Sequence, residues 1–154
     1  MRARLICVGK PKNPHTNALY DNFEDRLSRL GLEFGNGWVA EERSGGRYSD
    51  VHVMERESRL LLAGLDKNTR LVVLDRRGKA HDSERLAALL ERWVVPSATF
   101  VLGGPLGHHD VLLERADETW SLGPLTLPHE LARVVAVEQI YRAMTLIRGV
   151  PYHK

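Results

Sequence analysis

The sequence predicts an α/β fold: a mostly parallel sheet with helices on both faces. Short apolar runs at 5–8, 71–74 and 98–102 alternate along the chain with segments whose apolar residues repeat at helical spacing. These runs are almost continuously apolar rather than alternating, which is typical of strands buried on both faces of a parallel sheet. Ligands of such sheets bind beyond the carboxyl ends of the strands, so we expect a site in the turns that follow the runs.

The first strand is expected at 5–8, because the apolar run there closes at Gly9. A helix should follow, with Thr16 as its N-cap and Gly31 as its C-terminal stop, since leucine and phenylalanine recur between them at helical spacing. A second strand is expected at 34–39.

The middle of the chain predicts two further strand–helix pairs. A polar loop over 41–47 leads to a helix that begins near Ser49 and ends before Gly64. The next strand, 70–75, should turn out of the sheet at 76–79. A helix capped by Asp82 or Ser83 then precedes the strand at 98–102.

After the glycine-rich turn at 103–107 we expect a short helix at 111–117 and a last short strand at 120–122. Residues 123–127 form a loop that leads to Pro128, which suits the first position of a long helix. That helix should run to Gly149 and leave the tail 150–154.

Length and composition indicate one domain over residues 1–154. With 43% hydrophobic and 27% charged residues, the chain has enough apolar side chains for one core. A single cysteine, Cys7, excludes internal disulfides and multi-thiolate zinc sites, and it favours a cytoplasmic location. The apolar run near the start is too short for a signal peptide, and nothing approaches the roughly 20 apolar residues of a membrane span. The formal net charge of +2 permits an anionic partner without requiring one.

Several short motifs exclude common kinds of site. The turn Gly103–Gly107 allows close approach of a ligand to the backbone, but it is neither a P-loop nor a dinucleotide fingerprint. The segment His129–Arg133 begins like a zinc-binding helix and ends in arginine where the second histidine should stand. His108 and His109 are expected in a solvated loop. We therefore predict no metal site.

The last helix and the tail hold a second group of polar side chains. Glu138 and Arg142 are neighbours at i and i+4, either as a surface ion pair or at the border of a partner surface. The terminal Tyr152, His153 and Lys154 place a phenol, an imidazole and an ammonium in a row. Such a tail either frays or closes over a site, where it could stack a base and handle a proton.

Four ordered motifs carry a resemblance to a known family. They are Val101-Leu102-Gly103-Gly104-Pro105-x-Gly107, then Ser121-Leu122-x-x-Leu125-Thr126-Leu127-Pro128-His129, then Glu138-Gln139-Ile140-Tyr141-Arg142-Ala143, and the terminal Pro151-Tyr152-His153. Together they closely resemble the ribosomal large subunit methyltransferase H family. These are SPOUT-superfamily enzymes that methylate N3 of a pseudouridine in 23S rRNA.

The resemblance implies a fold, an assembly and a cofactor. It implies an α/β fold with a C-terminal trefoil knot, and a homodimer with its sites at the subunit interface. It also implies that S-adenosylmethionine (SAM) is the methyl donor. By similarity, the residues that hold SAM are Leu74, Gly103, Gly104, Leu122, Gly123, Pro124, Leu125, Thr126 and Leu127.

The resemblance also suggests catalytic roles. N3 of the base must lose a proton when it takes the methyl group, and we expect His153, or second to it Glu138, to assist. Tyr152 would order the target base, and Arg142 would meet RNA phosphate or hold the tail. Glu138 and Arg142 could belong to either protomer.

The expected substrate is 23S rRNA within the assembled 70S ribosome, with no DNA or membrane partner. A small chain of modest charge is poorly equipped to read a long RNA sequence, because phosphate contacts give affinity without discrimination. Two alternatives stay open: a SPOUT methyltransferase acting on tRNA or on another rRNA nucleotide, and a non-catalytic ribosome-associated binding protein.

Overall fold

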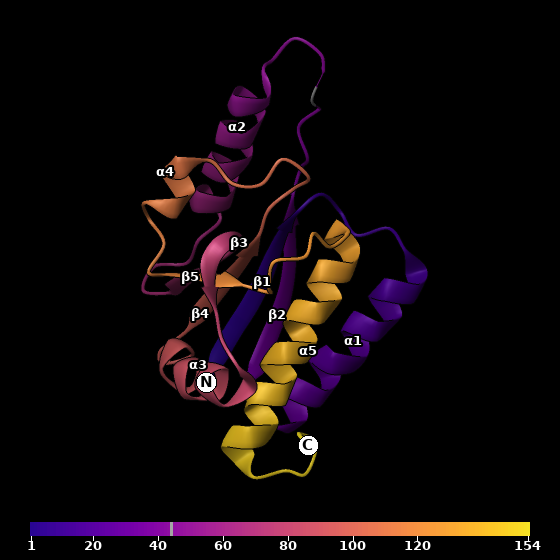
Figure 1. Ribbon diagram of the computed structural model, residues 1–154, viewed down its shortest axis with the longest axis vertical. Coiled ribbons are helices and arrows are strands. Elements are labelled where there is room, and N and C mark those ends of the chain that lie inside the picture. The colour runs from indigo at the N-terminus through magenta and orange to yellow at the C-terminus, as the bar shows by residue number, and fades with distance from the viewer. Residues whose placement is uncertain (44) are drawn as a thin grey trace.

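The computed structural model describes residues 1–43 and 45–154 and confirms the α/β prediction (Figure 1). All strand pairs described are parallel, and the sheet has the order β2-β1-β4-β3-β5. The elements are β1 (Arg2–Val8), α1 (Pro14–Arg29), β2 (Glu33–Val39), α2 (Asp50–Ala63), β3 (Arg70–Ala80), α3 (Ser83–Trp93), β4 (Ala98–Leu102), α4 (Asp110–Leu113), β5 (Glu118–Ser121) and α5 (His129–Arg148).

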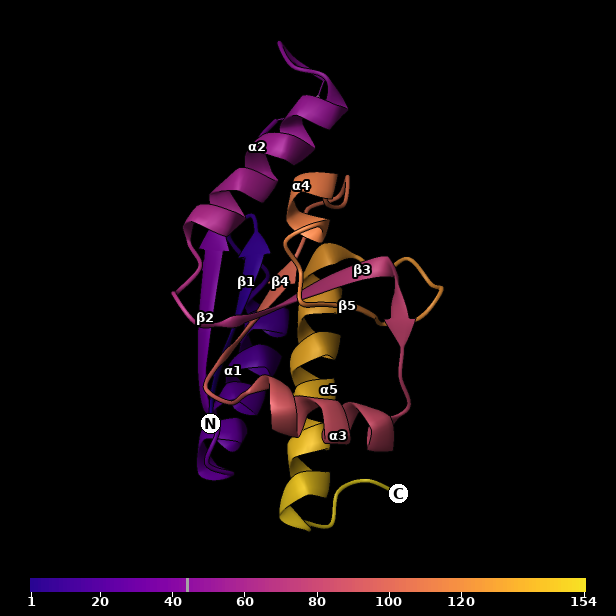
Figure 2. The same cartoon turned by 90° about the vertical axis from the view of Figure 1, so that its left-hand side faces the viewer.

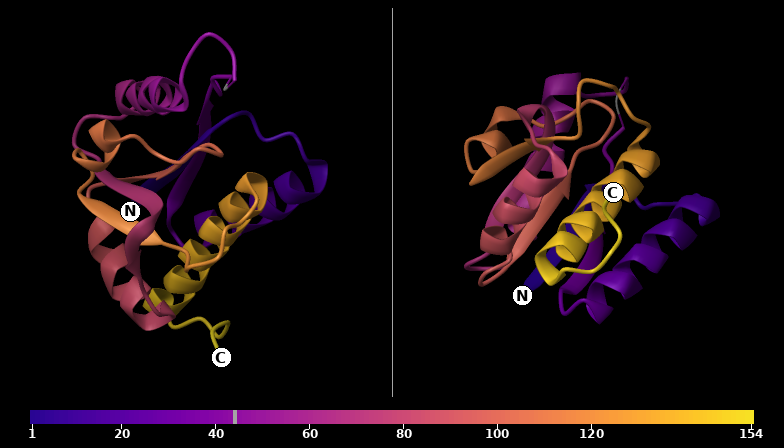
Figure 3. Two further views of the ribbon diagram at one scale, coloured as in Figure 1. Left: turned by 45° about the horizontal axis from the view of Figure 1, so that its top comes forward. Right: turned by 60° about the horizontal axis from the view of Figure 1, so that its bottom comes forward.

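The strand order explains which helix covers which face. Crossovers between parallel strands are right-handed, and here successive crossovers run in opposite directions along the sheet. Helices α1 and α3 therefore lie on one face, where α5 packs against both, and α2 and α4 lie on the other face (Figures 2 and 3).

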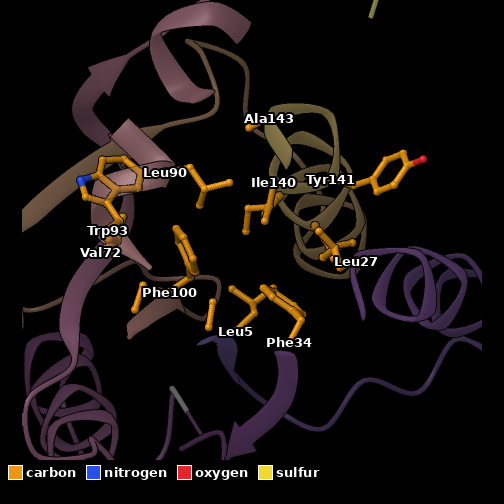
Figure 4. Packing of buried hydrophobic residues seen from close by; sticks show 14 of the residues in the cluster. Leu5, Leu27, Phe34, Val72, Leu90, Trp93, Phe100, Ile140, Tyr141 and Ala143 are labelled. Carbon is orange, nitrogen blue, oxygen red and sulfur yellow. The ribbon is translucent and has the colours of Figure 1, made fainter. Parts of the chain in front are cut away.

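Two apolar cores follow from these two layers. The larger lies between the sheet and α1, α3 and α5, and it includes Leu5, Phe100 and Ile140 (Figure 4). The smaller lies under α2 and α4 and includes Ile6 and Val101. Neighbouring residues of one strand thus enter different cores, which is why the central strands carry continuous apolar runs such as Leu5–Val8 and Phe100–Leu102.

Most helix ends lie where the sequence predicts, with one correction. Ser49 caps α2, Asp82 caps α3, and Gly149 ends α5 in the left-handed conformation. The prediction that Thr16 caps α1 is wrong. The Asn13 side chain accepts hydrogen bonds from the backbone N–H groups of residues 15 and 16, and Pro14 follows it at the first helical position, a stronger start signal than threonine.

The sequence placed the ends of three elements around β3 and β5 wrongly. The turn expected at 76–79 is part of β3, which resumes its pairing with β5 at Lys79 after a bulge. Helix α4 covers only 110–113 of the region expected at 111–117, and β5 begins at 118 rather than 120. Asp117 explains both shifts, because its backbone and side chain bond the backbone of Leu71 and draw the chain into the sheet.

The polar loop expected over 41–47 includes Ser44, which lies outside the described residues. On either side of it, the chain forms neither helix nor strand. None of the described helices is long and apolar enough to cross a membrane.

Candidate active site

A cleft of about 820 Å³ opens at the carboxyl edge of the sheet, beside the bulge of β3 and beyond the ends of β4 and β5. It lies where parallel-sheet geometry predicts a ligand. All nine residues predicted to hold a cofactor line it: Leu74, Gly103, Gly104, Leu122, Gly123, Pro124, Leu125, Thr126 and Leu127. The structure thus brings the bulge of β3 and the ends of β4 and β5 together around one space, and leucine, glycine and proline make up more than half of its lining.

The glycine turn after β4 packs closely against neighbouring residues of the protein interior. A Cβ atom at Gly103 would lie 2.9 Å from the imidazole ring of His108. A Cβ atom at Gly104 would lie 3.2 Å from a Glu57 carboxylate oxygen and from a Val8 methyl group. A side chain at Gly103 would therefore displace either the buried ring or the backbone that faces the cleft.

His108 is buried beneath this turn, so the expectation of a solvated loop is wrong for it. Its Nε2 lies 3.2 Å from the carbonyl oxygen of Leu74. Burial lowers the pKa of His108 to about 4, although Asp75 and the Leu74 carbonyl act in the opposite direction. The ring is therefore neutral at pH 7, and Nε2 carries the proton that it donates to Leu74. His108 thus ties the end of β3 to the glycine turn of β4.

Two buried polar residues of α2 lie beside this turn. The Ser58 hydroxyl accepts a 3.1 Å hydrogen bond from the backbone N–H of His109. Glu57 accepts one from the backbone N–H of Glu42, and burial raises the pKa of its carboxyl. The sequence analysis missed both, although Glu57 stands four residues from the apolar positions Val53 and Leu61, on the buried face of the helix.

The structure brings three of the four predicted catalytic residues into direct contact. One oxygen of the Glu138 carboxylate, Oε1, accepts a 2.7 Å hydrogen bond from Arg142 and a 3.0 Å hydrogen bond from the Tyr152 hydroxyl. The Arg142 guanidinium also lies 4.7 Å from the centre of the Tyr152 ring. Burial and the bond to Glu138 raise the pKa of Tyr152, which keeps its phenol protonated at pH 7. The tail is therefore held against α5.

Arg26 of α1, which sequence reasoning missed, also holds this tail. Its guanidinium lies 4.1 Å from the centre of the Tyr141 ring and 5.3 Å from that of Tyr152, and it donates a 2.7 Å hydrogen bond to the Tyr141 hydroxyl. The two tyrosine rings meet edge to face at 4.8 Å. We call Arg26, Glu138, Tyr141, Arg142 and Tyr152 the tail cluster.

His153, the fourth predicted catalytic residue, faces α3 instead. Its Nε2 lies 3.2 Å from a carboxylate oxygen of Glu84. Its Nδ1 is buried, and among the described residues it has no hydrogen-bond partner. When the ring is neutral, a proton on Nε2 points at Glu84 and Nδ1 is a bare acceptor.

The cleft lies at the start of α5, whereas the tail cluster begins in the middle of that helix, at Glu138. His129 at the start of α5 lines the cleft, whereas Glu138 stands about 14 Å further along the helix axis, at 1.5 Å per residue. In the part of the chain that the structure describes, the cleft lining includes none of Glu138, Arg142, Tyr152 and His153. One copy of the chain therefore does not unite the two predicted groups of site residues.

The segment that begins like a zinc-binding helix serves the fold. Glu130 accepts hydrogen bonds from the backbone N–H groups of Lys12 and Asn13, and Arg133 is buried 3.5 Å from the centre of the Tyr20 ring. Within 1–43 and 45–154, no three His, Cys, Asp or Glu side chains gather as a metal site.

Comparison with known proteins shows the family. A family model described as "Predicted SPOUT methyltransferase" matches residues 1–153. Proteins named "Ribosomal RNA large subunit methyltransferase H" from Pseudomonas fluorescens and Xylella fastidiosa are 40% and 43% identical to this chain. The alignments cover 100% of this chain in both cases, and 100% and 98% of those proteins.

The solved structure of the SpoU methyltransferase AviRb from Streptomyces viridochromogenes, in complex with the cofactor AdoMet, aligns with 91% of this chain and 56% of its own. Its TM-score of 0.44 and 15% identity are too low to support an inference. On the family model and the full-length relatives, the chain belongs to the ribosomal RNA large subunit methyltransferase H family of SPOUT methyltransferases.

Proposed function

We propose that this protein is a SAM-dependent methyltransferase that methylates N3 of a pseudouridine in 23S rRNA on assembled 70S ribosomes. The relatives are named for methylation of large-subunit ribosomal RNA, and they match this chain over its full length. The observation that carries the proposal is the cleft, since all nine residues predicted to hold SAM line this one space.

The cleft suits SAM in size and chemistry. Its volume of about 820 Å³ lies in the range of small-molecule sites, roughly 300–1,000 Å³. Leucine side chains can cover the adenine, and the backbone of 103–107 and 122–127 can meet its polar edges. The buried Nε2 of His129, which also lines the cleft, has no hydrogen-bond partner among the described residues and is available to a ligand. When bound, SAM supplies an electrophilic methyl group on its sulfonium.

The proposal includes the trefoil knot of the SPOUT fold in the C-terminal part of the chain, and a homodimer. The separation of the cleft from the tail cluster supports the dimer. A second copy can bring its own Glu138, Arg142, Tyr152 and His153 to the cleft of the first. Each site would then combine the cofactor cleft of one protomer with the tail of its partner.

His153 is the proposed proton acceptor. Its Nδ1 is buried in this copy and has no hydrogen-bond partner among the described residues, so it can take the proton from N3 of the base once the tail opens toward the cleft of the partner. Glu138 is second to it as a base, because its Oε1 already accepts bonds from Arg142 and Tyr152. Of the two roles considered for Arg142, these contacts favour holding the tail. Tyr152 then orders the target base against the held tail.

Methyl transfer from labelled SAM to 70S ribosomes that lack the modification tests the proposal. Digestion and mass spectrometry should locate the label at N3 of one 23S pseudouridine. Protein-free 23S rRNA should be a much poorer substrate, because a small protein needs the assembled particle to select one nucleotide. Equal activity on the free RNA would refute the requirement for the ribosome.

The same experiment separates the alternatives. Label in tRNA or in another rRNA nucleotide would keep the SPOUT chemistry and change the substrate. Ribosome binding with neither SAM binding nor methyl transfer would indicate a non-catalytic ribosome-associated protein.

A further inference from the structure

Strand β3 leaves its ladder with β5 at the mouth of the cleft. Leu74 and Lys79 both pair with Trp120, so residues 75–78 bulge out between them. The bend is visible in Figure 2 as the curved part of β3, close to the loop that leads into α5. Arg76 and Arg77 of this bulge line the cleft. β-Bulges often re-aim side chains next to active sites.

The bulge is fixed in place by its own residues. A Cβ atom at Gly78 would lie 2.6 Å from the carbonyl oxygen of Thr119, so only glycine fits this close to β5. Arg77 makes hydrogen bonds of 3.0 and 3.2 Å to the two carboxylate oxygens of Asp75, and Asp75 also accepts the Arg77 backbone N–H. The cations of the bulge therefore stand on a rigid support.

Two positive charges, Arg76 in the bulge and Lys79 directly after it, have no acidic partner among the described residues. The charge of Arg77 is offset by Asp75 and by Asp110, whose carboxylate lies 3.9 Å away. Arg76 and Lys79 are exposed, and they form no salt bridge within the described part of the chain. Lys79 lies outside the cleft lining, so a small ligand in the cleft does not account for it.

We propose that Arg76 and Lys79, presented by the bulge of β3, bind the phosphate backbone of the substrate RNA at the mouth of the cleft. The proposal rests on the proposed function and adds a docking surface to it. A guanidinium and an ammonium are the groups that proteins use on nucleic-acid phosphates. Phosphate contacts here fix the position of the strand while the target base enters the cleft.

The test uses Arg76→Gln, Lys79→Gln and the double variant, with unmodified 70S ribosomes as the probe. We expect the double variant to raise both the Kd and the KM for ribosomes about tenfold. The slope of log affinity against log salt should become shallower by about one to two, because two phosphate contacts are lost. The SAM affinity of Lys79→Gln should stay unchanged, because Lys79 does not line the cleft.

A double variant of equal charge is the matched control. Arg92→Gln with Lys67→Gln also removes one exposed arginine and one exposed lysine, on α3 and in the turn before β3, which form no salt bridge within the described residues and do not line the cleft. We expect this control to match the wild type in ribosome affinity and in salt slope. Equal losses in both double variants would overturn the proposal, since net charge alone would then explain the effect.

The outcomes separate the docking surface from the enzymatic function. Wild-type methyl transfer with unchanged ribosome affinity and KM in the bulge variants overturns the docking surface and leaves the function standing. Ribosome binding that depends on the bulge, with no methyl transfer by the wild type, refutes the function and retains the surface. No ribosome binding by the wild type refutes both.

Discussion

The cleft and the tail cluster are built in opposite ways. Leucine, glycine and proline make up more than half of the cleft lining, and buried polar side chains such as His108 and Ser58 hold the backbone of its wall. The tail cluster is made of charged and aromatic side chains that hold one another, centred on the carboxylate of Glu138 and the ring of Tyr152.

This difference suits two different tasks. A backbone cleft keeps its shape when surface side chains change, and it offers N–H and C=O groups to a small ligand. A side-chain cluster can present a base, a phenol and a cation to a reacting atom, but each group depends on its neighbours for position. Changes in the cleft should therefore affect SAM affinity first, whereas changes in the tail should affect the rate of transfer.

The largest expected effect comes from the tail. His153→Ala should lower the rate of methyl transfer at saturating SAM and ribosomes by about 100-fold or more, the usual loss when a general base is removed. SAM affinity, measured by calorimetry, should be unchanged because the proposed role of His153 is toward N3 of the base and not toward SAM. Deletion of 152–154 should have at least the same effect. Rates within about threefold of wild type for both variants would end the assignment of His153.

The second-largest expected effect tests whether Glu138 holds the tail or accepts the proton. Glu138→Gln keeps the size of the side chain and weakens its charge-assisted bonds to Arg142 and Tyr152, so we expect the rate to fall about tenfold. Glu91→Gln, an exposed position on α3, is the matched control. A loss as deep as that of His153→Ala would instead identify Glu138 as the proton acceptor.

The sequence alone predicted the position of the cleft better than it predicted the residues that hold the cleft in shape. Apolar runs placed the strands at 5–8, 71–74 and 98–102, and the rule for parallel sheets then placed the ligand at their carboxyl ends. The bulge of β3 escaped prediction because it depends on pairing with β5, which has no signal in the local sequence. His108 was expected in solvent, since only the folded chain puts the Leu74 carbonyl against its ring.

The other features that the sequence analysis missed have physical explanations, and for one of them the sequence did contain a signal. Asn13 followed by Pro14 is a recognisable helix start, and it outcompetes Thr16. Arg26 meets the tail through contacts that span most of the chain, and no periodicity records these. In the proposed dimer, the meeting of one copy's tail with the other's cleft would be set by a surface between chains, which the sequence pattern of one chain does not encode.

A smaller effect is expected in the cleft. Gly103→Ala should weaken SAM binding about tenfold, because the new methyl group and the buried His108 ring compete for one space. His108→Ala in the same chain should restore part of the loss, since the ring is then absent, and this coupling is measured as a double-mutant cycle. Gly46→Ala is the control, because no described atom lies within 4 Å of its added Cβ. Additive losses would show that the ring does not set the shape of the turn.

The smallest effect is a dependence of stability on pH that originates at the buried His108 in the cleft lining. The pKa of His108 is about 4 in the folded protein and near 6.5 when the chain unfolds, so between these values the unfolded chain binds more protons. The stability that neutral His108 provides is complete above about pH 7 and declines as the pH falls, by about 1 kcal/mol at pH 5.5. His108→Leu removes the titrating group, so urea unfolding at pH 7.5 and 5.5 should show a smaller loss in the variant by this amount. The tail cluster contributes equally to the pH dependence of stability in both proteins, so its contribution cancels in the comparison. Equal losses in the two proteins would mean that His108 accepts a proton in the folded state and that the Leu74 carbonyl is held by another group.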